Sequence, residues 1–171
     1  PFDIELCSLQ VELLFVLHGK RNQALKKSKQ CIQSEPEYIH TYIIAANYLQ
    51  PRWGGSRRQQ LKFIEESANA TAHIYGDGIY ALLVGDYTDR TGKIFKGYGG
   101  SFSWLRTKKG IYDLFEKYGK SNYILHLYGY TAMLAHDHEA FAEVLKETGT
   151  QWDESKKRYY KKQSWYNQHL A

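Results

Sequence analysis

The stretch YLQPRWGGSRRQQ, residues 48–60, interrupts an otherwise helical sequence and decides how the helices on either side are joined. Pro51 cannot continue a helix, because it has no amide hydrogen and its ring clashes with the preceding turn. Gly54 and Gly55 supply backbone angles that other residues adopt only with strain, so we predict a positive φ at one of them. Trp53 is expected to pack beneath the turn, largely buried, and to fix the angle between the helices. The stretch is therefore predicted to be a structural corner.

Helical periodicity continues directly on both sides of this corner. Ser56 is a favourable N-cap, and Gln59 three residues later completes a capping box, so a helix is predicted to start here. The apolar stripe of this helix consists of Leu61, Ile64, Ala68 and Ala72. A second helix, which ends at the corner, is predicted over about residues 37–49.

Two further helices are predicted nearer the N-terminus. The first carries apolar residues at i, i+3, i+7, i+10 and i+11, and we expect this stripe to face the core: Leu6, Leu9, Leu13, Val16 and Leu17. It is predicted to end at His18-Gly19, because glycine adopts the left-handed conformation after a helix without strain. The next helix is predicted from about Asn22 to Gln33 and stops before Pro36.

This pair of helices has the spacing of a tetratricopeptide repeat, in which a turn glycine, small packing residues and a closing proline recur at fixed offsets. Gly19 is followed at these offsets by Ala24, Ser28, Cys31 and Pro36, although Ser28 replaces the usual aromatic residue. The small residues let the two helices approach closely, and the proline starts the next unit. The spacing predicts a stack of antiparallel helical hairpins.

The corner that follows the repeat carries a resemblance to a known family. Pro51 to Ser56 reads Pro-Arg-Trp-Gly-Gly-Ser, and it comes directly after the repeat of Gly19 to Pro36. The combination resembles a bacterial family of unknown function, the domain of unknown function 4034-like proteins. The resemblance implies tetratricopeptide-like repeats preceded by an N-terminal region, and it implies no reaction and no substrate. The given chain is accordingly expected to be the C-terminal part of a longer protein.

The rest of the sequence predicts more helices around one irregular region. A loop is expected near residues 86–100, with a sheet no larger than a stray hairpin. Helices are predicted at about 77–84, from Ser101 or Ser103 to Tyr118, and at about 121–134, 138–148 and 153–168. The expected fold is all-α: a tetratricopeptide-like, right-handed stack of about eight helices forming a single domain over residues 1–171.

Positive charge is concentrated in three groups, although the net charge is only +5. The groups are Lys20, Arg21, Lys26, Lys27 and Lys29; Arg52, Arg57, Arg58 and Lys62; and Lys156, Lys157, Arg158, Lys161 and Lys162. Solvated helix faces are the simpler interpretation. The alternative is binding to nucleic acid or an anionic surface, with Tyr159, Tyr160 and Trp165 available for stacking on bases.

Residue patterns typical of catalysis or metal binding are weak. No glycine-rich phosphate loop is present in the sequence, and HDHE at 136–139 is the nearest approach to a metal cluster. His136 and His138 would point to different sides of a helix, and Asp137 is more simply an N-cap. We therefore predict a non-enzymatic protein without catalytic residues, cofactor or metal.

Two cysteines are too few for a disulfide framework or a zinc site. Cys7 and Cys31 each lie twelve residues from Gly19, so an antiparallel hairpin places them level with each other. Because a disulfide requires Cα atoms within about 7 Å, closer than most helix pairs come, we predict two neighbouring but reduced thiols and a cytoplasmic protein. A bond would instead indicate an oxidising compartment, such as the periplasm after removal of a leader.

The leading functional hypothesis is a helical-repeat module that binds a protein or peptide on the concave face of its stacked hairpins. Surface aromatic residues and arginines are the usual anchors of such interfaces, and the candidates here are Tyr42, Arg52, Trp53 and Arg57. A toxin-neutralising immunity protein is a further alternative that no particular residue supports. The sequence contains no apolar run of the roughly 18 residues that a membrane-spanning helix needs.

Overall fold

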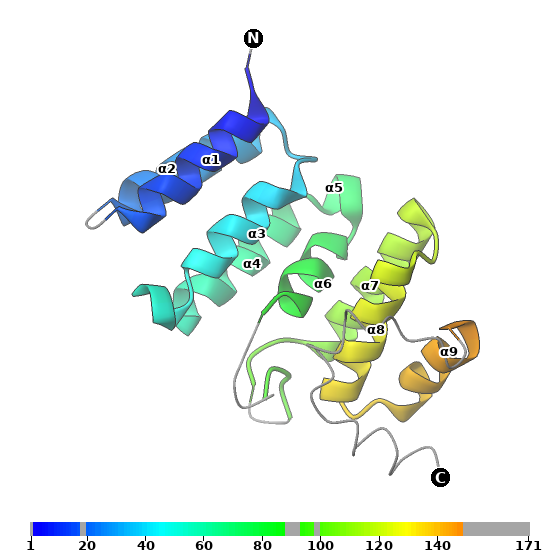
Figure 1. Ribbon diagram of the computed structural model, residues 1–171. Coiled ribbons are helices and arrows are strands. Elements are labelled where there is room, and N and C mark those ends of the chain that lie inside the picture. Colours follow the sequence, from blue (N-terminus) through cyan, green and yellow to red (C-terminus); the bar gives the residue numbers. More distant parts are fainter. Residues whose placement is uncertain (1, 18–19, 88–92, 98–99, 149–171) are drawn as a thin grey trace.

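The computed structural model describes residues 2–17, 20–87, 93–97 and 100–148 of the chain. Over these residues the protein is all-α, as predicted, and the extended backbone pairing among them is an isolated bridge between Phe95 and Phe102. The helices, labelled in Figure 1, are α1 (Ile4–Val16), α2 (Arg21–Ser34), α3 (Ile39–Tyr48), the 3-10 turn η1 (Pro51–Trp53), α4 (Arg57–Ala70), α5 (Ala72–Tyr75), α6 (Gly78–Gly85), α7 (Trp104–Tyr118), α8 (Asn122–Leu134) and α9 (His138–Thr148).

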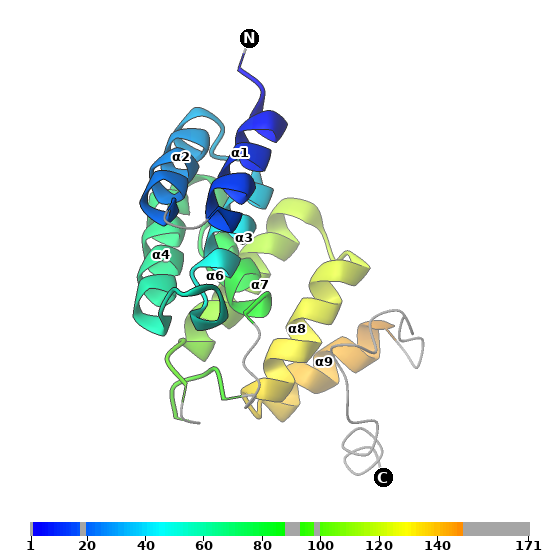
Figure 2. The ribbon, with the colours of Figure 1, turned by 60° about the vertical axis from the view of Figure 1, so that its left-hand side comes forward.

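The helices pack in consecutive pairs: α1 with α2, α3 with α4, α6 with α7, and α8 with α9. Both helices of each pair also contact the first helix of the next pair. Figures 1 and 2 show the pairs following one another from α1–α2 at one end of the molecule to α8–α9 at the other. Helix α1 therefore lies at one end of the array.

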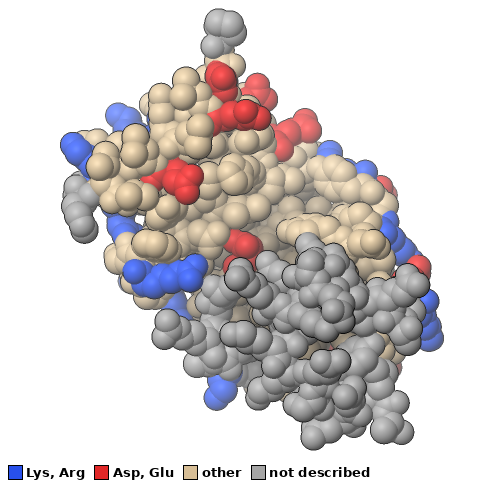
Figure 3. Space-filling view, in the orientation of Figure 1, with Lys and Arg blue, Asp and Glu red and all other residues tan. Residues whose placement is uncertain are grey.

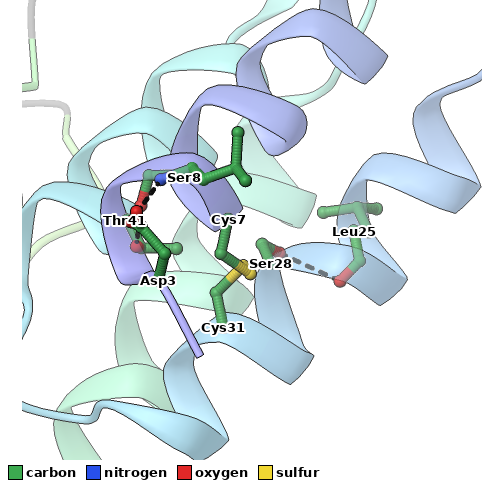
Figure 4. The surroundings of a disulfide bond; sticks show 8 residues. Asp3, Cys7, Ser8, Leu25, Ser28, Cys31 and Thr41 are labelled. Atoms are coloured by element: carbon green, nitrogen blue, oxygen red, sulfur yellow. Dashed lines mark hydrogen bonds between the residues drawn. A yellow bond between two sulfur atoms is a disulfide. The ribbon is translucent and has the colours of Figure 1, made fainter. Parts of the chain in front are cut away.

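The first pair is held together by a disulfide bond between Cys7 and Cys31, whose Cα atoms are 5.9 Å apart. The two cysteines are neighbours on adjacent helices, as predicted, and both are buried, but the prediction of reduced thiols is wrong. The reason is the close approach of α1 and α2 across Ala24 and Ser28, which are both fully buried. The Ser28 hydroxyl donates to the carbonyl of Leu25 on its own helix at 2.9 Å (Figure 4).

Helix α1 is rotated relative to the prediction. The five residues of the expected core stripe are between 48% and 61% exposed: Leu6, Leu9, Leu13, Val16 and Leu17. The buried residues of α1 are instead Cys7, Ser8 and Val11. They are smaller, and they suit the short distance to α2 and α3 better than leucine does. Ser8 also shares a hydrogen bond with the hydroxyl of Thr41 in α3.

The main core surrounds α6, in which every residue is buried. Helices α3, α4, α7 and α8 all contact it. Gly110 of α7 packs against the backbone of Asp77 at the start of α6, where a Cβ atom would overlap the Asp77 carbonyl. Tyr80 and Tyr128 are each 2% exposed and contribute the largest side chains of this region together with Tyr42. A helix without a polar face, such as α6, is stable only in such surroundings.

The described residues between α6 and α7 contribute apolar side chains to the core. Of the described residues here, Ile94, Phe95 and Phe102 are almost completely buried. The amides of Ser101 and Phe102 both donate to the carbonyl of Ile94, at 3.0 and 2.9 Å. Helix α7 then begins at Trp104, with Ser103 as its N-cap, which is one of the two predicted starts. These apolar side chains close one end of the core.

The C-terminal pair matches the prediction closely. Helix α9 has the predicted bounds, and the Asp137 carboxylate caps it by accepting a hydrogen bond from the amide of Ala140 at 2.9 Å. His136 before it adopts a positive φ of 55°, as the tight turn requires. The helix predicted at 153–168 lies outside the described residues. Within the described chain, no helix combines the length and the apolar character needed to cross a membrane.

Candidate functional site

The corner between α3 and α4, residues 48–56, is built as the sequence predicts. Pro51 begins the 3-10 turn η1, and Gly54 follows it with a left-handed φ of 77°. The amide of Gly54 donates to the carbonyl of Pro51 at 2.9 Å, which closes the turn. Ser56 then caps α4 by accepting a hydrogen bond from the amide of Gln59 at 3.2 Å. The predicted positive φ and the predicted N-cap are both confirmed.

Gly55 has a different role from Gly54. Its backbone lies directly against the end of α3, and a Cβ atom there would overlap the carbonyl oxygen of Leu49. Its amide donates to the carbonyl of Gln50 at 3.1 Å. One glycine thus provides the backbone angle, while the other permits the chain to return close to the helix that it has just left.

Arg21, the first residue of α2, joins the corner to the first helical pair. Its guanidinium donates to the carbonyl of Tyr48 at 3.2 Å and also to the carbonyl of Trp53. These two carbonyls belong to the last residues of α3 and η1. Carbonyls at the end of a helix have no amide donor within that helix, so Arg21 supplies the donor. Sequence reasoning missed this residue, because nothing local distinguishes Arg21 from the other basic residues around it.

Three rings, which we call the aromatic row, run from α1 to the corner: Phe15, Tyr48 and Trp53. The rings of Phe15 and Tyr48 are stacked with centroids 5.0 Å apart, and those of Tyr48 and Trp53 are 5.3 Å apart. The prediction that Trp53 is largely buried is wrong, because this residue is 51% exposed. Phe15 and Tyr48 already fill the space beneath the corner, so Trp53 covers them from outside. The Arg52 guanidinium lies 5.9 Å from the Trp53 ring centroid.

The four partner-binding candidates do not form one surface. Arg52, Trp53 and Arg57 are exposed and lie within the corner and the first turn of α4. Tyr42 is fully buried in the main core, and its hydroxyl donates to the carbonyl of Pro36 at 3.0 Å. The expectation that Tyr42 lies near a binding surface is therefore wrong; its position on the apolar side of α3 makes it a core residue.

A chain of polar side chains connects the inner side of the corner to α6. Gln50 donates to Asn47 at 2.7 Å, and Asn47 donates to the carboxylate of Asp86 at 2.7 Å. Burial raises the pKa of Asp86, and the hydrogen bond from Asn47 and the positive charge of Arg52 oppose that rise only in part. The corner is therefore fixed from below by α6 as well as from the side by α2.

The other polar clusters of the described residues join helices to one another. Asp77 pairs with Arg106 at 2.8 Å and with Lys109 at 3.1 Å, which ties the start of α6 to α7. Asp137 pairs with Lys108 at 3.0 Å, and Glu143 accepts hydrogen bonds from two tyrosines of α7 and α8, Tyr112 and Tyr128. In the part of the chain that is described, no three His, Cys, Asp or Glu side chains gather as a metal site would require.

Comparison with protein-family models, with curated proteins and with solved structures finds no match for this chain. The resemblance of Pro51–Ser56 and the preceding repeat to the bacterial family named above stays a prediction. What the protein does must therefore be argued from its own surface.

Proposed function

We propose that this chain is a non-enzymatic, tetratricopeptide-like module that binds a protein or peptide through the surface around the corner. The order of helix contacts supports the first half of this proposal. Each pair of helices packs on the next in the way that stacked hairpins do. Such stacks present extended surfaces on a rigid framework, which suits recognition of another chain.

The observation that carries the binding function is the half-exposed indole of Trp53 with the Arg52 guanidinium over it. Tryptophan and arginine are the residue types most enriched among those that dominate binding energy at protein interfaces. Trp53 is also held in place, because Tyr48 packs against its indole and Arg21 donates to its backbone carbonyl. A rigid aromatic side chain loses little conformational entropy when a partner covers it.

A displayed library of random peptides tests this proposal directly. The library is selected on the wild-type protein after depletion on the double variant Arg52→Glu, Trp53→Ala. Peptides that survive are synthesised with a fluorophore, and their affinities are measured by fluorescence anisotropy. We expect binding to the wild type in the micromolar range, and binding to the double variant that is weaker by at least about tenfold.

Leu105→Ala is the matched control, because Leu105 is 80% exposed and lies on α7, away from the corner. This variant is expected to bind the selected peptides as the wild type does. The double variant Arg52→Glu, Arg57→Glu is compared with Arg52→Glu alone. Weaker peptide binding by the double variant would show that the surface extends onto the first turn of α4. If the library yields no peptide that distinguishes wild type from the double variant, the corner is not a binding surface and the proposal fails.

The Cys7–Cys31 bond bears on where the protein functions. Disulfides form and persist in oxidising compartments and are rare in the cytosol. We therefore propose an oxidising compartment, such as the bacterial periplasm, in place of the cytoplasm that two reduced thiols would indicate.

A further inference from the structure

Helix α1 has two apolar faces on opposite sides. The inner face packs on α2 and α3 and includes Ile4, Cys7, Val11 and Phe15. The outer face, together with one residue beyond each end of the helix, forms what we call the outer stripe. Its residues are between 48% and 61% exposed: Leu6, Leu9, Leu13 and Val16 in the helix, with Phe2 before it and Leu17 after it. At about 100° per residue, the centres of the two faces lie on opposite sides of the helix axis. An α-helix that is apolar on both sides is typical of one with neighbours on both sides.

Among the described elements, α1 packs mainly on α2 and α3, and both lie on its inner side. Contiguous exposed apolar patches on soluble proteins mark interaction sites. The spacing is also specific, because Leu6, Leu9, Leu13 and Val16 occupy the alternating three- and four-residue steps of a heptad repeat. Such a seam fits another helix.

The charges beside the outer stripe are acidic. Glu5 and Glu12 are seven residues apart and flank one side of it, and Asp3 lies on the other side. Helix α1 contains no lysine or arginine, although the whole chain has a net charge of +5. Figure 3 shows this face of the molecule, with red acidic side chains around α1 and blue basic ones mainly toward the edges. A helix that docks here is therefore favoured if it carries positive charge.

We propose that the outer stripe is the docking site for an amphipathic helix of a partner protein, one whose apolar seam is flanked by lysine or arginine. Apolar side chains of that helix would cover Leu6, Leu9 and Leu13. Its basic residues would face Glu5 and Glu12, as oppositely charged residues do on either side of a helix-pair seam. This site goes beyond the function proposed for the corner, because no residue of the outer stripe belongs to the aromatic row; its flanking Glu12 accepts a hydrogen bond from Tyr48 of that row at 3.5 Å.

Charge argues against two other occupants. In an antiparallel pairing of α1 with a second copy of itself, in which Leu6 meets Val16 and Leu9 meets Leu13, Glu12 of one chain would face Glu12 of the other, which is repulsive. A helix that lies on an anionic membrane normally has lysine and arginine on its polar side, whereas the polar positions of α1 beside the stripe are acidic. A basic helix is the occupant that satisfies both the apolar seam and its acidic flanks.

Two designed helical peptides serve as probes. Both have leucine at the a and d positions; one has lysine at e and g, and the other has glutamate there. Binding of each fluorescent peptide to the intact protein is measured by anisotropy at low salt. We expect the lysine peptide to bind, and the glutamate peptide to bind weaker by at least about tenfold. Exchanging Glu5 and Glu12 for lysine should reverse this preference.

The apolar contribution is tested with Leu9→Ser plus Leu13→Ser, which should abolish binding of the lysine peptide. Because both side chains are exposed, the helical circular dichroism and thermal midpoint should be unchanged, and Leu105→Ser is the matched control on α7. Trp53→Ala should leave probe binding intact, which separates this site from the corner. Equal binding of both peptides would overturn the proposal. So would a dimer in sedimentation velocity that the Leu9 and Leu13 variant dissociates, or stripe-dependent binding to phosphatidylglycerol vesicles.

Discussion

The ring of Phe15 in α1 lies parallel to the ring of Tyr48 in α3, with an interplanar angle of 4°. The Tyr48 ring in turn supports Trp53 in the corner. The exposed indole is thus held from beneath by a side chain of the first helical pair. The orientation of α1 therefore matters for the corner as well as for the core.

Alanine substitutions in α1 should reveal its orientation. Phe15→Ala removes a packed ring and is expected to lower the free energy of unfolding by about 2 kcal/mol or more. Leu13→Ala, two residues away, removes a side chain that is 59% exposed and should change it by less than about 0.5 kcal/mol. Urea denaturation followed by circular dichroism measures both values. A larger loss of unfolding free energy in Leu13→Ala than in Phe15→Ala would mean that the leucine stripe faces the core, as the periodicity predicts.

The two corner glycines should respond differently to alanine. Gly54→Ala introduces strain at a φ of 77° and is expected to lower stability by about 1 kcal/mol. Gly55→Ala places a methyl group on the carbonyl of Leu49 and should lower it by more, about 2 kcal/mol, because backbone must move. Gly119→Ala is a suitable comparison for Gly54, since Gly119 has a φ of 73° and open space around it. If Gly55→Ala left the free energy of unfolding unchanged, this would contradict the close approach of Gly55 to the Leu49 carbonyl.

Free-thiol titration of the denatured, unreduced protein should find no thiol, because both cysteines of the chain are bonded. Reduction opens a link between residues 24 positions apart and is expected to lower the free energy of unfolding by about 3 kcal/mol. Urea denaturation with and without dithiothreitol measures this difference. The double variant Cys7→Ala, Cys31→Ala should be insensitive to the reductant. Two titratable thiols would contradict the bond.

Asp77 and Asp86 should change the free energy of unfolding in opposite directions as the pH falls. Burial alone would raise the pKa of Asp77, but hydrogen bonds from Arg106 and Lys109 outweigh it, so the pKa is lowered. Asp77 therefore stabilises the fold above the unfolded-state pKa of about 4, and this contribution is lost as pH falls through its lower folded-state value. Asp77→Asn should lower stability at pH 7 by about 1 kcal/mol or more, and the difference should shrink in acid.

Asp86 provides the opposite case. Burial raises its pKa, so its charged form is unfavourable in the folded protein, and stability is gained as pH falls through the folded-state pKa. Asp86→Asn keeps an acceptor for Asn47 and should raise stability at pH 7, with the advantage disappearing below about pH 4. Thermal midpoints of the wild type and of Asp86→Asn, measured between pH 7 and about pH 4, test this prediction. Loss of stability in Asp86→Asn at pH 7 would show that the buried charge is favourable.

The existence and bounds of most helices could be predicted, because local signals determine them. Ser56, Ser103 and Asp137 all cap helices where the sequence places a cap. The left-handed angle at Gly54 is equally local. The orientation of α1 could not be predicted from periodicity, because this helix is apolar on both sides and the larger side chains dominate the pattern. The close contact of Ala24 and Ser28 with α1 selects the face with smaller residues instead.

The candidate site was predictable only in part. Its corner follows from a short motif, but Arg21 and Phe15 reach it from more than 25 residues away in the sequence. The exposure of Trp53 depends on the rings of Phe15 and Tyr48, which occupy the space beneath the corner. The disulfide was missed for a related reason. Most helix pairs are too far apart for a disulfide, whereas the Cα atoms of Cys7 and Cys31 are only 5.9 Å apart.

The Cys7–Cys31 bond also determines how a mechanical load would pass through the molecule. A pull on the N-terminus reaches Cys7 within the second turn of α1 and is transmitted through the sulfur atoms to Cys31 in α2. Residues 8–30 lie between the two cysteines in the sequence and carry no tension. The outer stripe from Leu9 to Leu17 is inside this shielded segment, whereas Phe2 and Leu6 precede Cys7 and carry the load, so stretching the chain would pull on one end of a docked helix only.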